Sequence, residues 1–132
     1  MDARLKTELL RTVTSISEKY YPDELEQVNA LGEVLIEDMD NNVSQLDLKN
    51  AGHYEFALQD ASAIISSFSV LMGTFKTFMD IIALINKKKV PDLEILKTNW
   101  KNELLKAGLS DLESEEIVRS FSNDVKTTFD LK

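Results

Sequence analysis

Apolar side chains recur without interruption along the segment from about Gly52 to Asn86. Steps of three and four residues alternate, which forms two apolar columns along a helix. A third apolar column lies beside these two. This period indicates one wide helical stripe, wider than the seam of a two-stranded coiled coil. Such a helix has to be covered from more than one side, so the segment predicts an all-α protein built around it. Its columns are Tyr54, Leu58, Ala61, Ile65, Phe68, Met72, Phe75, Met79 and Ile82, with Ala57, Ile64, Leu71, Phe78 and Ile85 as the third.

The length of this segment limits how it fits into a chain of 132 residues. A straight helix over residues 52–86 would be about 52 Å long, whereas a compact globule of this size has a diameter of roughly 36 Å. The helix is therefore bent at Gly73, flanked along its length by other helices, or partly covered by a second copy. We predict a single domain over residues 1–132, an elongated bundle of about five helices. Two helical hairpins, at about 2–40 and about 92–131, flank the long helix.

Local signals mark where each hairpin turns. Pro22 removes a backbone donor and favours a break in the first hairpin. Gly108 suits the left-handed residue that ends a helix, with Leu109 packing back on Leu104. The Ser110–Glu113 spacing is that of a capping box, which predicts a new helix at this point.

Two further features bear on the helix ends and crossings. Lys87–Lys89 lies where the long helix ends, and cations interact favourably with the negative end of the helix dipole; Pro91 then stops the helix. Gly32 lies inside an apolar stripe, where glycine costs about 1 kcal/mol relative to alanine. A close helix crossing would account for that glycine.

The net charge of −8 is distributed unevenly. Residues 22–60 hold ten acids and one base, whereas residues 76–106 hold seven bases and four acids. A nucleic-acid-binding protein needs a basic face, so nucleic acid is not an expected partner. The acidic segment would instead attract a partner with a basic surface, chiefly by raising the association rate.

The residues that usually carry catalysis or metal binding are sparse. The chain has no cysteine and one histidine, His53, which has no metal-ligand spacing around it. Glu33, Glu37 and Asp40 share a helical face, but an EF-hand continuing from them fails. Val43 replaces its glycine and Lys49 its bidentate glutamate. We expect no enzyme activity, no metal and no cofactor.

These observations favour a non-enzymatic interaction module, a small accessory, adaptor or inhibitor protein in the cytoplasm. It would bind another protein through an acidic helical face, an apolar helix groove, or both, with a homodimer through the central helix as a further expectation. The candidate partner-binding residues are Glu26, Glu33, Glu37, Asp38, Asp40, Phe68, Met72, Phe75, Met79 and Trp100.

Three other classes remain open. An acidic inhibitor that mimics nucleic acid would need carboxylates spread over a broad surface. A ligand-binding bundle or small enzyme would need a cavity in the core. A membrane-active helical protein is the third class. The longest uncharged stretch, residues 61–75, is fifteen residues long, short of the about 20 needed to span a bilayer, so membrane insertion is not expected.

Overall fold

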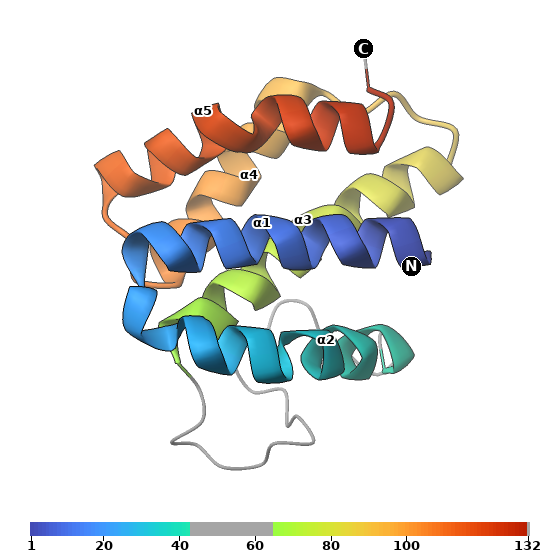
Figure 1. The fold of residues 1–132 in the computed structure, drawn as a ribbon. Helices are drawn as coiled ribbons and strands as arrows, with labels where there is room; N and C mark the ends of the chain where they lie inside the picture. The colour runs from blue at the N-terminus through green and yellow to red at the C-terminus, as the bar shows by residue number, and fades with distance from the viewer. Residues whose placement is uncertain (43–64, 132) are drawn as a thin grey trace. The chain divides into compact units, whose positions relative to one another are not determined.

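The computed structural model describes residues 1–42 and 65–131, and in these residues the protein is all-α (Figure 1). The fold class predicted from the sequence is therefore confirmed. The elements are α1 (Ala3–Tyr20), a 3-10 turn η1 (Pro22–Glu24), α2 (Leu25–Asn41), α3 (Ser66–Asn86), α4 (Leu93–Lys106) and α5 (Asp111–Thr128).

The chain divides into two compact units, Met1–Met72 and Gly73–Lys132, and the boundary falls inside α3. The charge divides with them. The first unit has thirteen acids and five bases, a net charge of −8, and the second has ten of each. All of the net charge thus belongs to the first unit. A single domain over residues 1–132 stays a prediction.

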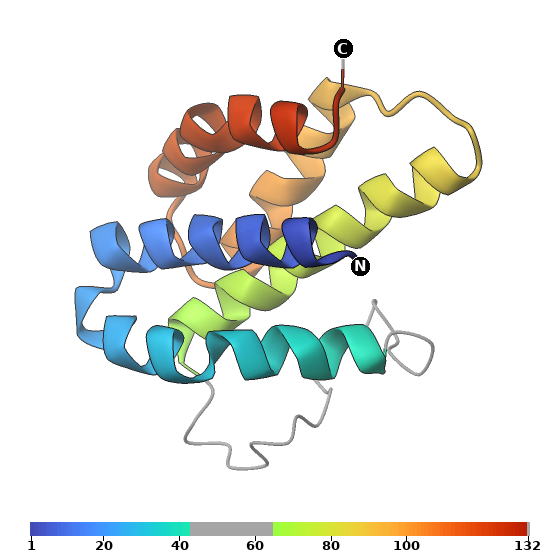
Figure 2. The ribbon, with the colours of Figure 1, turned by 45° about the vertical axis from the view of Figure 1, so that its right-hand side comes forward.

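In the first unit, α1 and α2 pack side by side as a helical hairpin (Figures 1 and 2). Their contact is close at Gly32, where an added Cβ would lie 2.8 Å from Leu10 Cδ1. The neighbouring atom is the far end of a side chain, so Gly32 makes room for Leu10, and the close helix crossing expected at this glycine stays a prediction. The buried apolar side chains of the pair are Leu5, Leu9, Val13 and Ile16 from α1 and Val28, Leu35, Ile36 and Met39 from α2.

The hairpin turns at Pro22, as predicted, and the turn also fixes the start of α3. Glu24 Oε1 accepts a hydrogen bond from the Ser67 backbone N–H at 2.7 Å. The buried Ser17 hydroxyl donates to Ser67 Oγ at 2.8 Å. A carboxylate at a helix N-terminus satisfies a free N–H group and interacts favourably with the helix dipole. A residue 43 positions away therefore caps α3.

The central helix starts later in the described chain than its apolar repeat predicts. α3 begins at Ser66, and Ile65, which the repeat placed inside the helix, is not helical. The Ile65 carbonyl accepts from Phe68 and Ser69 N–H and so opens the helix. The rest of the predicted segment, with Tyr54 and His53, lies outside the described residues.

α3 runs through Gly73 without a break in its helical backbone. Its 21 residues correspond to about 32 Å, less than the roughly 52 Å expected for a straight helix over residues 52–86. Gly73 serves a close approach instead, because an added Cβ would lie 2.9 Å from Glu103 Cβ on α4.

In the second unit, α4 and α5 form the other helical hairpin. Gly108 has φ 106°, and the buried Leu109 donates its N–H to the carbonyl of Leu104. The capping box of Ser110 and Glu113 is present at the start of α5. These local predictions are confirmed. The core includes Phe75, Phe78 and Ile81 from α3, Leu96, Trp100 and Leu104 from α4, and Ile117, Val125 and Phe129.

Candidate functional site

The acidic face of α2, defined as Glu26, Glu33, Glu37 and Asp40, follows one side of the helix. Successive helical residues are about 100° apart, so separations of seven, four and three residues bring these carboxylates onto one stripe. Glu26, Glu33 and Glu37 are exposed, and Val34 beside them is 52% exposed. The structure thus brings four of the five predicted acids together, next to an exposed apolar side chain.

Half of this face is bound to α1 by ion pairs. Lys6 Nζ lies 2.8 Å from Glu37 Oε1 and 3.1 Å from Asp40 Oδ2. The N-terminal ammonium of Met1 lies 3.0 Å from Asp40 Oδ1. In the described part of the chain, Glu26 and Glu33 have no such partner. These two carboxylates carry the charge that a partner could reach.

The ion pairs shift the titration of both partners. Burial raises the pKa of Asp40, but hydrogen bonds from the N-terminal ammonium and Lys6 outweigh it and hold the pKa below its usual value. Hydrogen bonds to Glu37 and Asp40 raise the pKa of Lys6. Both shifts stabilise the charged forms, so this end of the face is an internal contact at neutral pH.

Asp38 points away from the acidic face, because it is about 140° from Glu33 and about 160° from Asp40 around the helix. It is half-buried, and its carbonyl and carboxylate oxygens accept from Asn42 Nδ2 at 2.8 and 3.3 Å. The structure therefore gives Asp38 contacts at the end of α2 and does not bring it together with the other acids.

The apolar candidates lie mostly in the core. Phe68, Phe75 and Trp100 are 1–3% exposed, whereas Met72 and Met79 are half-buried. The Trp100 indole Nε1–H donates to the buried Thr74 Oγ1 at 3.1 Å. Three of these five side chains thus present almost no surface to a partner.

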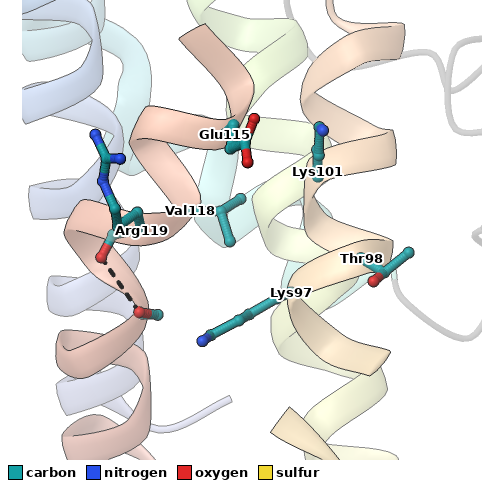
Figure 3. Close-up of a pocket in the computed structure, with 7 residues that line it drawn as sticks. Lys97, Thr98, Lys101, Glu115, Val118 and Arg119 are labelled. Atoms are coloured by element: carbon teal, nitrogen blue, oxygen red, sulfur yellow. Dashed lines mark hydrogen bonds between the residues drawn. The ribbon is translucent and has the colours of Figure 1, made fainter. Parts of the chain in front are cut away.

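Between α4 and α5 lies a groove of about 320 Å³ that the sequence analysis did not identify. Figure 3 shows Lys97 extending from α4 toward α5. Lys97 is paired with Glu94 at 3.3 Å and Lys101 with Asp111 at 3.1 Å, so the chain already supplies carboxylates to both lysines. The lining residues are Lys97, Thr98, Lys101, Glu115, Val118, Arg119 and Ser122. The spacing of four between Lys97 and Lys101 was the available signal.

Within the described residues, the core beside Trp100 leaves little space for a small ligand, and no cluster of metal-binding side chains is present. The small pocket beside Trp100 measures about 10 Å³, about the volume needed for one water molecule. No group of three or more His, Asp or Glu residues there is arranged to hold a metal ion. One helix of this part of the chain, α3, is long and apolar enough to cross a membrane, and half of its apolar 18-residue stretch is buried inside the protein.

Asp80 is the carboxylate of the second unit whose environment disfavours its charge. Burial and the nearby Glu103 raise its pKa, although Lys76 opposes the change. The Lys76 ammonium is itself 3.0 Å from Glu103 Oε1. Lys76 is therefore already paired with Glu103, and Asp80 lies close to this ion pair.

Because the pKa of Asp80 is raised, Asp80→Asn is expected to increase the free energy of unfolding by an amount that depends on pH. The folded state binds the proton more tightly than the unfolded state, so ionised Asp80 destabilises the fold once the pH exceeds the raised pKa. Asp80→Asn is expected to raise the free energy of unfolding at pH 7. The gain should shrink as the pH falls through the raised pKa and vanish below the ordinary range, about pH 4.

Urea unfolding of Asp80→Asn and of the parent chain at a series of pH values measures this difference. The exposed Asp124 on α5 supplies the matched control, since Asp124→Asn removes the same charge outside the contact. A gain for Asp80→Asn that is independent of pH, or equal to that of Asp124→Asn, would contradict the electrostatic explanation.

The fold defines an all-α protein composed of two compact units, with an acidic face on one helix as its candidate site. No family model, no curated protein and no solved structure matches the chain.

Proposed function

We propose that the protein is a non-enzymatic interaction module, an accessory, adaptor or inhibitor protein, that binds a basic segment of a partner along the acidic face of α2. The observation that carries this proposal is the pair of exposed carboxylates, Glu26 and Glu33, which have no ion-pair partner among the described residues. They belong to the unit that holds the whole net charge of −8.

The geometry of α2 supports binding of an extended or helical basic segment. Glu26 and Glu33 are seven residues apart, about 10 Å along the helix. Val34 provides an exposed apolar contact next to Glu33. A partner with two cations at similar spacing and an aliphatic side chain just beyond the second cation would match both features. The ion pairs of Lys6 hold the far end of α2 against α1, so this surface is already ordered before binding.

Charge reversal at the two unpaired acids tests the proposal. The probe is a fluorescently labelled amphipathic peptide of lysine and leucine, with binding followed by anisotropy and stopped flow. Glu26→Lys/Glu33→Lys is expected to weaken binding on the order of tenfold, mainly by slowing association, with the loss reduced at high salt. Both positions are exposed, so the fold should tolerate the change.

The matched control is Glu115→Lys/Asp124→Lys on α5, which alters the net charge equally at two exposed positions. Equal weakening by both double variants would mean that only net charge matters, and the proposed face would be wrong. In cells, a photo-crosslinking residue at Val34 should capture the physiological partner. Capture should fail in Glu26→Lys/Glu33→Lys and persist in the control.

A further inference from the structure

The connection between α3 and α4, residues 87–92, concentrates cations that have no carboxylate partner. Lys87, Lys88 and Lys89 are exposed, and in the described residues none of them forms an ion pair. The lysines of α4 differ, because Lys97, Lys101 and Lys106 each lie within 3.5 Å of a carboxylate. We call residues 87–90 the lysine loop.

The acid nearest to the lysine loop in sequence is engaged elsewhere. Asp92 Oδ1 accepts from the backbone N–H groups of Glu94 and Ile95, at 3.0 and 3.4 Å, and so caps α4. It satisfies the free donors of that helix. Its carboxylate is therefore directed at α4, and the three ammonium groups are left without a charge partner.

Exposed aliphatic side chains accompany these cations. Val90 is 91% exposed, and Ile85 in the last turn of α3 is 42% exposed. Figure 2 shows the connection as a rounded loop that projects beyond the ends of α3 and α4. A convex tip with cations and aliphatic groups suits a flat, anionic and partly apolar surface.

The backbone of the loop holds a lysine in a conformation that favours glycine. Lys88 has φ 57°. Its N–H donates to the Ile85 carbonyl, and the Lys89 N–H donates to the Leu84 carbonyl. This is the Schellman motif, which prefers glycine at the left-handed position and an apolar residue after it. The chain has those residues at Gly108 and Leu109 but two lysines here. Local strain of this kind often accompanies a functional position.

Helix-end electrostatics account for only part of the lysine loop. A cation stabilises the last turn of a helix, and Lys87 directly follows α3. Lys88 and Lys89 lie beyond the helix, where the effect of the dipole falls off. The dipole also gives no reason for an almost fully exposed Val90.

We infer that the lysine loop is a docking site for an anionic membrane surface. The three lysines contact the lipid headgroups, and the side chains of Val90 and Ile85 insert between the headgroups. Each lysine near such a surface adds attraction, and the apolar area that an inserted aliphatic group buries adds to the strength of binding. Protein partners are anchored by aromatic or arginine side chains in pockets, and this convex loop has lysine and aliphatic residues instead. The site lies outside α2, so the proposed function does not depend on it.

Vesicle co-sedimentation with the full chain tests the inference. Binding is expected to vesicles that contain about 30% phosphatidylserine, to be absent with phosphatidylcholine alone, and to reverse in a high-salt wash. Lys87→Gln/Lys88→Gln/Lys89→Gln should weaken binding on the order of 100-fold. Val90→Ser should weaken it about tenfold by removing the inserted side chain.

The matched control is Lys97→Gln/Lys101→Gln/Lys106→Gln, which removes the same charge from α4. Binding within about threefold of the parent is expected for it. Lys88→Gly should change stability and vesicle binding in opposite directions. It should raise the melting temperature by relieving the strained backbone. It should also weaken vesicle binding about fivefold. A change in stability without a change in binding would overturn the role of Lys88.

Failure to bind phosphatidylserine vesicles would overturn the inference, as would equal loss in the loop and control variants. Binding that resists a high-salt wash and survives the triple substitution would assign the attachment to α3 instead. Soluble poly-glutamate that binds the parent but not the loop variant, with no vesicle binding, would assign the loop to an acidic protein. Inorganic phosphate that saturates the loop with no vesicle binding would assign it to a free anion.

Discussion

Trp100→Ala is expected to lower the free energy of unfolding by about 3–5 kcal/mol, the range for truncating a large buried aromatic side chain. The indole is 3% exposed and packs in the core of the second unit. The substitution also removes the donor to Thr74 Oγ1, which lies 3.1 Å from the indole nitrogen. A buried hydroxyl that loses its partner adds to the cost of the cavity. Urea unfolding followed by circular dichroism measures the change.

Two further variants separate packing from hydrogen bonding. Trp100→Phe keeps an aromatic ring but removes the N–H, and Thr74→Val removes the hydroxyl. Each is expected to cost about 1–3 kcal/mol, because each leaves one buried polar group without its partner. The double variant should cost less than the sum, since neither group then remains to be satisfied. Unchanged stability of Trp100→Ala would instead favour the prediction of Trp100 as a partner anchor.

The elements that follow from local chemistry were predictable from the sequence. The turn at Pro22, the helix end at Gly108 and the capping box at Ser110 are three such elements. Each depends only on residues within a few positions of it in the sequence. Proline and glycine act through backbone dihedral angles, and a capping box acts within one turn. Such signals require no knowledge of the tertiary fold.

The start of α3 could not be predicted in the same way. The apolar repeat continues through Ile65, yet the helix begins at Ser66, where Glu24 accepts the Ser67 N–H. The capping group is 43 positions from the helix that it caps. Hydrophobic periodicity reports which residues share a face, and it contains no information about a distant carboxylate.

The candidate site shows the same limit. The spacing of Glu33, Glu37 and Asp40 correctly placed three acids on one face of α2. It did not reveal that Lys6, 31 positions away, holds Glu37. Reversal of all acids in the segment would therefore mix loss of an internal ion pair with loss of partner binding. The structure identifies Glu26 and Glu33 as the positions where the two effects separate.

Phe75→Ala is the second variant with a large expected effect. It also tests whether the apolar side of α3 belongs to the core or to an interface. Phe75 is 1% exposed, and its truncation should lower the free energy of unfolding by about 3–5 kcal/mol. Met79 on the same helix is half-buried. Its side chain retains contact with water, so Met79→Ala should cost less than half as much.

The comparison of these two variants also tests the predicted homodimer through the central helix. If α3 is core, Phe75→Ala destabilises the chain at every protein concentration, and light scattering gives the same mass for the parent and the folded variants. If a second copy covers α3, the melting temperature of the parent rises with protein concentration, and Met79→Ala lowers the dimer fraction. If the melting temperature of the parent depends on protein concentration, and Met79→Ala is stable and monomeric, then this face of α3 is an interaction surface.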